Sequence, residues 1–538
     1  MSIVLSVRDL SLAIGEDQLL KKVGFDIKEG EIFALVGESG SGKSLTSLAI
    51  MRLLPEVISV ASGDIFLKEK SLFALPEYEM QKIRGKSIAM IFQEPMSALN
   101  PVMTVGEQVA EVIRIHLGLK KEAVKAKVIS LFKEVALKDP ETRYSWYPHQ
   151  LSGGQKQRVM IAMALACEPA LLIADEPTTA LDVTIQAQVL ELLKSIRDAR
   201  GLSILFITHD MAVVSQMADR IAVMKEGEIL EQAERKVFFE NPEHPYTQAL
   251  LRDAMAGKEE RSKEIGKDTL LEVENLKVYF PVKKGIFQRT VGYVQAVDGV
   301  SFSIPRGKTL ALVGESGSGK STIGKAILSL VPVTSGSVKF EDQDLVVLKE
   351  ERLKPYRQKI QVVFQDPFSA LNPRMTIGEI IREGMVSLGV GPGKRSEQDT
   401  YIKDLLVKVD LDEGYIDRYP HEFSGGQRQR IGIARALAVK PELIVCDEPT
   451  SALDVSVRVQ VLKLLKKLQD ETGVSYLFIT HDLSIIATVA DEVAVMKEGK
   501  IVEQGLVEDV MYAPQHSYTK KLLASAPKLY LKKEIWKK

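Results

Sequence analysis

The chain has 538 residues, of which 45% are hydrophobic and 27% charged, and its 71 basic and 72 acidic side chains give a formal net charge of −1. This length exceeds one ordinary domain, and the composition excludes a disordered or fibrous protein. The even charge balance gives no electrostatic case for a nucleic-acid partner, and two cysteines are too few for a disulfide framework or a four-ligand zinc site.

The N-terminal segment lacks the basic and apolar regions of a secretory signal, so we expect none. The longest apolar stretch, Val159 to Ala174, is interrupted by Glu168 and Pro169 and is shorter than the roughly 20 residues of a membrane-spanning helix. We therefore expect a chain that does not cross a membrane by itself and that works in a reducing cytosolic setting, with Cys167 and Cys446 as buried packing residues.

Four sequence motifs each occur twice. The first set is GESGSGKS at residues 37–44, LSGGQ at 151–155, DEPTTALD at 175–182 and FITHD at 206–210. The second set is GESGSGKS at 314–321, FSGGQ at 423–427, DEPTSALD at 447–454 and FITHD at 478–482. The copies stand 277 residues apart at the first motif, from Lys43 to Lys320, and 272 apart at the others, so the second copy is five residues shorter before Gln365.

A repeat with the period of a whole domain indicates a duplication. It predicts a first domain of residues 1–255, a charged linker of residues 256–268 and a second domain of residues 269–538. A solvated helix is the alternative interpretation of the linker.

Short apolar runs predict buried strands directly before the motifs. They are Ile32–Val36, Leu171–Ala174 and Ser203–Ile207 in the first copy and Thr309–Val313, Leu443–Val445 and Ser475–Ile479 in the second. A helix is predicted over Leu45–Leu53, after the glycine-rich motif. Strands that alternate with helices indicate an α/β fold with a mainly parallel sheet, whose ligand chemistry lies at the carboxyl ends of the strands.

The glycine-rich motif matches the phosphate-binding pattern G-x-x-x-x-G-K-[ST]. Its glycines let backbone N–H groups surround phosphate oxygens at the positive end of the following helix. Lys43 and Lys320 are expected to reach the β- and γ-phosphates, and Ser44 and Ser321 to hold Mg²⁺. The predicted nucleotide-binding residues are Gly37, Glu38, Ser39, Gly40, Ser41, Gly42, Lys43 and Ser44, with Gly314, Glu315, Ser316, Gly317, Ser318, Gly319, Lys320 and Ser321.

Acidic pairs follow a predicted strand at the same edge of each sheet. Asp175 and Asp447 suit a contact to Mg²⁺. Glu176 and Glu448 are placed to orient or deprotonate the attacking water. An acidic surface turn is the alternative, which the phosphate-binding motif upstream makes the weaker interpretation.

Two further pairs of polar residues complete the predicted catalytic set. His209 and His481 end the next strands and are expected to contact the γ-phosphate, with a structural role at the strand end as the alternative. Gln93 and Gln365 each stand beside a Ser-Ala-Leu-Asn-Pro run, and they are expected to contact Mg²⁺ or the water, with turn chemistry as the alternative.

The SGGQ segments predict a second set of phosphate-facing donors at helix starts. They comprise Ser152, Gly153, Gly154 and Gln155, and Ser424, Gly425, Gly426 and Gln427. Because the glycine-rich loop of the same domain already surrounds the phosphates, this second cradle makes sense only for the nucleotide of the other copy. We therefore expect two copies facing head to tail, with two ATP molecules each held between one P-loop and the opposite SGGQ.

These motifs, in this order, resemble those of the ATP-binding-cassette (ABC) ATPases over nearly the whole chain. The resemblance implies two tandem P-loop domains that use ATP and Mg²⁺. Each domain would have a mainly parallel sheet core, an antiparallel β subdomain and a helical subdomain.

Finer features resemble the dipeptide, oligopeptide and nickel importer ATPases, and the fused layout resembles microcin-C-type and glutathione-type importers. The features are Tyr147–Gln150 and Tyr419–Glu422 before the SGGQ motifs, and His244–Thr247 and His516–Thr519 near the end of each copy. We interpret the histidines of these segments as helix-start or packing residues rather than metal ligands.

The resemblance implies an ATP-hydrolysing importer subunit, peripheral to the cytoplasmic face of a bacterial inner membrane, with peptides as cargo and nickel or glutathione as alternatives. It also implies two membrane-spanning permease subunits, docked on residues 93–149 and 365–421, and an external substrate-binding protein. A soluble tandem-cassette factor on the ribosome is the rival class, but it usually has a long basic helical linker. A DNA-repair ATPase would need zinc-finger cysteines.

The chain departs from the family pattern in two ways. Many relatives carry a C-terminal cysteine cluster proposed as an iron–sulfur site, which two isolated cysteines cannot form. The family also stacks adenine on an aromatic residue, for which the second copy offers Phe280 or neighbouring Tyr279, whereas the first has Ile14 at the matching place. We expect weaker ATP binding at the first P-loop, by on the order of 1 kcal/mol.

Overall fold

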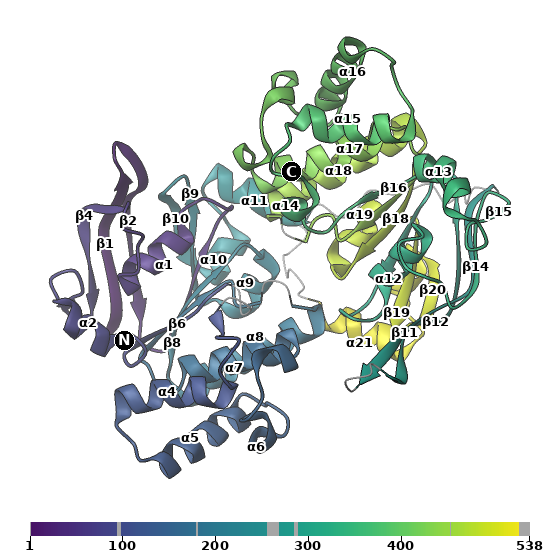
Figure 1. The fold of residues 1–538 in the computed structure, drawn as a ribbon. Helices are drawn as coiled ribbons and strands as arrows, with labels where there is room; N and C mark the ends of the chain where they lie inside the picture. The colour runs from purple at the N-terminus through teal and green to yellow at the C-terminus, as the bar shows by residue number, and fades with distance from the viewer. Residues whose placement is uncertain are drawn as a thin grey trace. The chain divides into compact units, whose positions relative to one another are not determined.

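The computed structural model of the chain describes residues 2–93, 98–178, 181–255, 268–284, 289–451 and 453–526. These residues form two compact units, the first ending at Met255 and the second ending at Ala526. Apart from Asp268, the predicted linker lies outside the described residues. Figure 1 shows the elements of each unit.

A six-stranded, mainly parallel sheet forms the centre of the first unit, with strand order β10-β9-β3-β8-β7-β6. Its strands are β3 (Ile32–Val36), β6 (Ile88–Ile91), β7 (Leu171–Asp175), β8 (Ser203–Thr208), β9 (Arg220–Lys225) and β10 (Glu228–Glu234). Only the β9–β10 pair is antiparallel. Every residue of β3, β7 and β8 is buried. Strands covered on both faces have continuous apolar runs, which is why the sequence marked them.

The second unit repeats this sheet in the order β16-β17-β18-β13-β19-β20. Its strands are β13 (Thr309–Val313), β16 (Ile360–Val363), β17 (Leu443–Asp447), β18 (Ser475–Thr480), β19 (Glu492–Lys497) and β20 (Lys500–Leu506). The strands predicted before the glycine-rich motifs have the observed bounds. The other four are longer by one or two residues at their carboxyl ends, so each incorporates the first residue of its polar motif.

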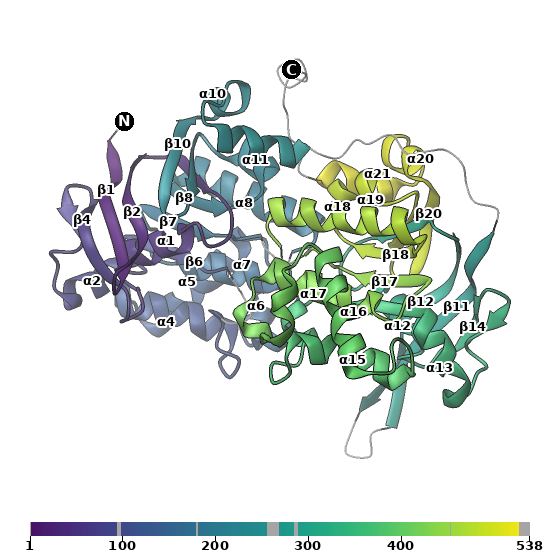
Figure 2. The same cartoon turned by 90° about the horizontal axis from the view of Figure 1, so that it is seen from above.

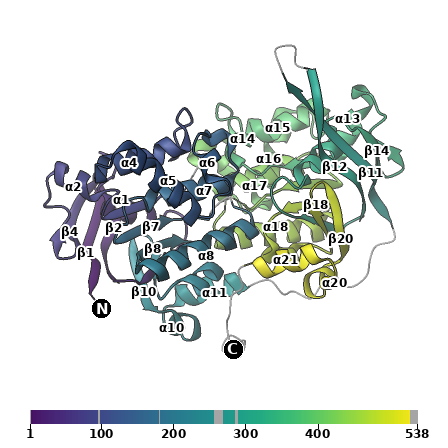
Figure 3. The ribbon, with the colours of Figure 1, turned by 90° about the horizontal axis from the view of Figure 1, so that it is seen from below.

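A four-stranded antiparallel sheet lies beside the core sheet of each unit. The first contains β1 (Ile3–Ile14), β2 (Asp17–Lys28), β4 (Ser59–Leu67) and β5 (Lys70–Ser71), and the second contains β11 (Thr269–Lys284), β12 (Arg289–Pro305), β14 (Ser335–Phe340) and β15 (Gln343–Asp344). The second copy is five residues shorter before Gln365, and most of these residues are missing from this sheet, because β14 has 6 residues and β4 has 9. The β11–β12 hairpin is longer than β1–β2 and projects beyond its sheet (Figure 3).

A group of helices forms a separate subdomain in each unit (Figures 1 and 2). In the first unit these are α4 (Val105–Leu117), α5 (Lys121–Glu134), α6 (Pro140–Arg143) and α7 (Gly153–Ala164); in the second they are α14 (Pro367–Ala370), α15 (Ile377–Leu388), α16 (Arg395–Lys408) and α17 (Gly425–Leu437). Thr104 and Thr376 cap α4 and α15 by accepting a hydrogen bond from the N–H three residues on. Gly118 and Gly389 end these helices in the left-handed conformation that glycine favours.

The other helices lie on the sheets or near the end of each unit. They are α1 (Lys43–Met51), α2 (Glu77–Ile83), α8 (Val183–Arg200), α9 (Met211–Met217), α10 (Arg235–Glu240) and α11 (Pro245–Met255), then α12 (Lys320–Ile327), α13 (Glu350–Lys359), α18 (Val455–Thr472), α19 (Ile486–Val489), α20 (Val507–Tyr512) and α21 (Ser517–Ser525), with short 3₁₀ turns at Pro148–Gln150, Glu413–Asp417, Pro420–Glu422 and Leu483–Ile485. Within the described part of the chain, none of the helices has the length and apolar character needed to span a bilayer.

The predicted bounds of the first motif helix, Leu45–Leu53, were wrong at both ends. Helix α1 begins at Lys43 because Gly42, with φ of 104°, turns the chain directly into it. It ends at Met51 because Arg52 takes a left-handed conformation and donates its N–H back to Ala49. The α/β class and the three-part architecture of each cassette are confirmed, and both cysteines are buried as expected.

Candidate nucleotide-hydrolysing sites

Each glycine-rich loop follows a buried strand and opens a helix, as a phosphate cradle requires. Gly37 has φ of 155°, and a Cβ atom there would lie 2.1 Å from the carbonyl oxygen of Met224. Gly314 repeats this contact, with 2.3 Å from its Cβ position to the Met496 carbonyl oxygen. A side chain at either position would collide with the backbone, so glycine is required for the approach of the loop to the neighbouring strand.

The loop lysines are buried inside the turn that they follow. The Lys43 Nζ donates to the carbonyl oxygens of Gly37, at 2.8 Å, and Glu38, at 2.7 Å. Lys320 makes the same two contacts, at 2.8 Å to the Gly314 oxygen and 2.9 Å to the Glu315 oxygen. These carbonyls fix the ammonium group at the helix start, where the predicted phosphates would meet it.

A serine–aspartate pair joins each motif helix to the neighbouring strand. Ser44 Oγ donates to Asp175 Oδ1 at 3.2 Å, and Ser321 Oγ donates to Asp447 Oδ1 at 2.8 Å. Burial raises the pKa of Asp175 to about 6, and burial also raises the pKa of Asp447. A hydroxyl and a carboxylate are hard oxygen donors, and a bound divalent cation would offset the cost of the buried charge, so the residues fit Mg²⁺.

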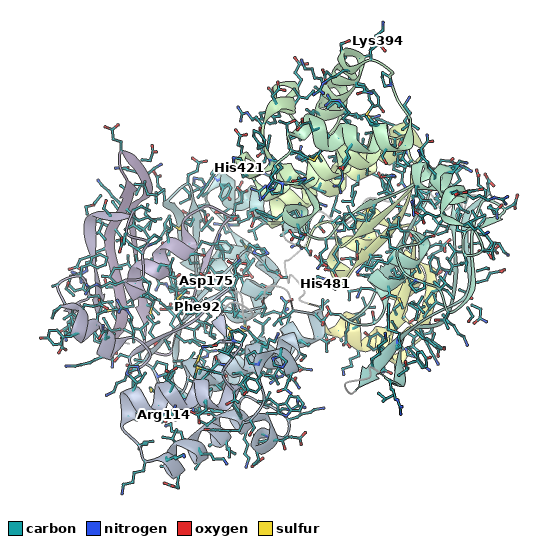
Figure 4. All side chains as sticks on the ribbon, in the orientation of Figure 1. Phe92, Arg114, Asp175, Lys394, His421 and His481 are labelled. Atoms are coloured by element: carbon teal, nitrogen blue, oxygen red, sulfur yellow. The ribbon has the colours of Figure 1, made fainter. Side chains whose placement is uncertain are left out.

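A glutamate is held between a glutamine and a histidine in each unit. Gln93 Nε2 donates to Glu176 Oε2 at 2.9 Å, and His209 Nδ1 lies 3.1 Å from Glu176 Oε1. The amide nitrogen therefore holds the glutamate, and the amide oxygen of Gln93 is the atom that could face a metal or water. Figure 4 labels Asp175, which precedes Glu176 at the end of β7.

The second unit repeats this arrangement. Gln365 Nε2 donates to Glu448 Oε2 at 2.8 Å, and His481 Nδ1 lies 3.1 Å from Glu448 Oε1, close enough for an ion pair but without hydrogen-bond alignment. Burial acts against ionisation of both partners, yet their mutual contact prevails: the pKa of Glu448 is lowered and the pKa of His481 is raised. The pair therefore favours a carboxylate beside an imidazolium.

The backbone of each glutamate is itself unusual. Glu176 and Glu448 both have φ of 47°, a left-handed conformation that is uncommon for residues other than glycine. Their N–H groups continue the sheet by donating to Ile207 and Ile479, each at 2.9 Å. Strained backbone that the surrounding sheet holds in place often marks a functional position.

The SGGQ segments form the starts of α7 and α17. Ser152 Oγ accepts from the Gln155 N–H at 3.4 Å, and Gln155 Oε1 accepts from the Ser152 N–H at 3.0 Å, which is a capping box. Ser424 and Gln427 repeat it. Ser152 and Gly153 are exposed, so this helix start remains accessible to a ligand.

The structure also places residues that motif reasoning weighed differently or missed. Tyr279 donates its hydroxyl to Asp298 Oδ1 at 2.6 Å, which ties it to the hairpin, while Phe280 is 38% exposed and Ile14 is 42% exposed. Ser47, which the motif does not include, donates to Asp175 Oδ2 at 3.5 Å. The sequence feature that could have indicated Ser47 is its position three residues after Ser44 on the same helix. Gly324 occupies the equivalent position in the second unit.

The histidines of the two finer sequence features have the predicted structural roles. His244 Nδ1 and His516 Nδ1 accept hydrogen bonds from the N–H groups of Tyr246 and Tyr518, each at 3.1 Å, at the starts of α11 and α21. His149 and His421 stack on the tyrosines two residues before them, with ring centroids 5.7 Å and 5.9 Å apart.

In each unit the parallel sheet therefore gathers a P-loop, a Ser–Asp pair and a Gln–Glu–His group at one edge. This fold and site define a P-loop nucleoside triphosphatase, present twice in the chain.

Comparison with known proteins identifies the family. Residues 20–179 and 297–451 match the ABC transporter family, and residues 230–276 and 502–538 match the oligopeptide/dipeptide transporter C-terminal region. A peptidoglycan transport ATP-binding protein of Agrobacterium fabrum is 46% identical, with 97% of this chain and 96% of that protein covered. A glutathione import ATP-binding protein of Salmonella typhimurium is 45% identical, with 97% and 89% covered. The chain belongs to the ABC transporter family and is an ATP-binding ATPase.

The buried Asp175 carboxyl predicts a pH-dependent stability. Its folded pKa of about 6 exceeds the ordinary value of 3.8, so the native state loses stability as the pH rises between these values. Asp175→Asn removes this loss. The free energy of unfolding of the variant should exceed that of the parent at both pH values, and the excess should be about 1–2 kcal/mol larger near pH 7.5 than near pH 5. Urea unfolding without nucleotide and with a chelator measures this difference.

The exposed Asp342→Asn change is the control, and it should give the same small effect at both pH values. An equal gain for Asp175→Asn at both pH values would contradict the assignment.

Proposed function

We propose that the chain is the ATP-hydrolysing subunit of a bacterial peptide importer, peripheral to the cytoplasmic face of the inner membrane. One observation carries the proposal. Each unit combines a P-loop with a Gln–Glu–His group, and the same chain matches an oligopeptide/dipeptide transporter C-terminal region. The relatives named for peptidoglycan transport and glutathione import, similar over nearly their whole length, support an importer.

Within each site, the geometry supports a separate role for each of these residues. Glu176 and Glu448 orient or deprotonate the attacking water, and the glutamine and histidine on either side fix the carboxylate and the γ-phosphate. The loop N–H groups and the lysine hold the phosphates. Ser44 with Asp175 and Ser321 with Asp447, joined by Gln93 and Gln365, would hold Mg²⁺, which neutralises charge on the β- and γ-phosphates.

We further propose that each nucleotide is shared between the two cassettes. The start of α17, at Ser424–Gln427, would complete the first site, and the start of α7, at Ser152–Gln155, would complete the second. ATP binding would close the two halves, and hydrolysis with phosphate release would open them.

Removal of both catalytic carboxylates should separate ATP binding from hydrolysis. Glu176→Gln with Glu448→Gln keeps the side-chain shape but removes the base, so turnover should fall at least about 100-fold while ATP stays bound. Phosphate release and retention of labelled ATP measure the two properties. The exposed Glu351→Gln change is the control, and rapid turnover in the double variant would refute the assigned role.

The first unit offers a docking site for a permease beside its glutamine. A cavity of about 310 Å³ is lined by Met90, Phe92, Ala98, Met160 and Met163. Phe92 directly precedes Gln93 and is 41% exposed (Figure 4). A partner side chain that enters this cavity would contact the segment that holds Gln93 on Glu176, which would couple the partner to the catalytic group.

The second unit has a charged side chain at the corresponding position. Arg435 stands where the first unit has Met163, and its Nη1 donates to the Ala370 carbonyl at 2.6 Å. Its guanidinium lies 5.9 Å from the centre of the Phe364 ring. We propose that the two permease subunits differ, with an apolar side chain presented to the first unit and a polar or acidic group to the second.

Met163→Arg tests this docking, because it gives the first unit the residue of the second. ATP hydrolysis by the free chain should be unchanged, while sedimentation of the chain with inner-membrane vesicles of its host should fall several-fold. The control is Val57→Arg, which places the same charge at a residue that is 68% exposed and does not line this cavity. Equal sedimentation of both variants would refute the docking site.

The adenine contacts should make the two sites unequal. Lys320→Ala leaves the first P-loop and Lys43→Ala leaves the second, so each site can be titrated alone with ATP. Stacking on Phe280 should make the second site bind about twofold to tenfold more tightly. Ile14→Phe in the Lys320→Ala background should raise the ATP affinity of the first site to that of the second. Equal ATP affinity of the two single sites, before this change, would contradict the proposed asymmetry.

Glutathione is the second candidate cargo, because the 45% identical relatives are named for its import. The cargo is selected by other subunits in this proposal, so the bound ligand of the partner substrate-binding protein, identified by mass spectrometry, decides between peptide and glutathione.

A further inference from the structure

Residues near the end of the second cassette contact the P-loop of that cassette. Glu503 in β20 accepts the N–H groups of Gln515, at 2.6 Å, and His516, at 3.1 Å. His516 then caps α21 by accepting the Tyr518 N–H at 3.1 Å. Together, Glu503 and His516 fix the first turn of α21, which carries Tyr518 and is labelled in Figure 3.

Tyr518 reaches the first peptide of the P-loop. Its hydroxyl oxygen accepts a hydrogen bond from the Glu315 N–H at 3.3 Å. The side chain is only 9% exposed, and the Lys497 ammonium lies 5.3 Å from the centre of its ring. A buried ring in contact with a cation has little freedom to move, so the hydroxyl is a fixed acceptor for the loop.

The same loop residue is held from its other side by the phosphate-binding lysine. Lys320 Nζ donates to the Glu315 oxygen at 2.9 Å, so the N–H and the carbonyl of Glu315 are both occupied. Gly314, one residue earlier, lies against the Met496 carbonyl and cannot shift toward it. Tyr518 therefore helps to set the position of the carbonyl that places the ammonium of Lys320.

The first cassette contains the same frame. Glu231 accepts the N–H groups of Glu243, at 2.9 Å, and His244, at 3.0 Å, and His244 accepts the Tyr246 N–H. The Lys225 ammonium lies 4.9 Å from the centre of the Tyr246 ring. The repetition of the acid, the histidine, the tyrosine and the lysine shows that both units build the start of this helix in the same way.

We propose that Tyr518 is a positioning residue for ATP at the second site, and that α21 thereby links the C-terminal region of the cassette to nucleotide affinity. Its hydroxyl holds the Glu315 peptide, so the P-loop is already in its binding shape before ATP arrives. The inference rests on ATP binding at this P-loop and does not depend on the cargo or on the permeases.

The test is ATP titration by calorimetry in the full-length chain, one site at a time. In the Lys43→Ala background, which leaves the second site, Tyr518→Phe should raise the Kd for ATP about threefold to tenfold, the effect of one lost hydrogen bond. In the Lys320→Ala background, which leaves the first site, the same change should leave the Kd unaltered. Tyr512→Phe, at a tyrosine that is 62% exposed on α20, is the matched control.

Comparison of the Kd at the two sites separates positioning from a general structural effect, and thermal unfolding measures the stability of each variant. An unchanged Kd at the second site would overturn the proposal, whether or not the melting temperature fell. An equal rise in Kd at both sites would also overturn it, because that result indicates a general structural effect. The single variant Lys43→Ala is titrated first. Loss of ATP binding in this variant would refute ATP binding at the second P-loop, independently of Tyr518.

Discussion

The parallel register of three buried strands is the constraint on which both sites depend. In the first unit, β3 pairs with β8 from Ile32 with Ile204 to Val36 with Thr208, and β7 pairs with β8 up to Asp175 with Ile207. The carboxyl ends of the three strands therefore stop at the same level. A slip of one residue in any strand would turn its polar terminus to the other face of the sheet. The P-loop, the acidic pair and the histidine meet because this register is fixed by complete burial of the strands.

Charge explains why this edge of the sheet suits a nucleotide. Each unit buries an aspartate whose pKa is raised by burial, beside a glutamate and opposite a lysine whose ammonium is surrounded by carbonyls. Such a site carries an electrostatic cost, because burial disfavours the charged form of each aspartate. A bound divalent cation would offset this cost, so part of the cost of burial would become affinity for a phosphate chain with its cation.

The two units contain the same candidate site residues but differ around them. Ser47 contacts Asp175 in the first unit, whereas Gly324 stands at that position in the second. Met163 lines a cavity in the first unit, and Arg435 stands at the equivalent position of the second unit. Duplication has therefore kept the residues of the P-loop, the Ser–Asp pair and the Gln–Glu–His group and has changed side chains that surround them.

The sequence by itself determined the duplication, the α/β class, the strands before each motif and nearly all of the candidate site. These features depend on local rules: continuous apolar runs for buried strands, and fixed residue types where the backbone must approach phosphate. Gln93, Glu176 and His209 could be named from their motifs, but their mutual contacts could not, since they come from three different strand ends.

Tertiary structure alone decided the contacts between distant segments. It tied Tyr279 to Asp298, brought Tyr518 to a P-loop about two hundred residues earlier in the chain and joined Arg435 to the Ala370 carbonyl. A motif records which residue types are needed, whereas these contacts depend on how helices and strands from different parts of the chain pack. Long-range packing has no fixed spacing in the sequence, and for that physical reason it became visible only in the folded structure.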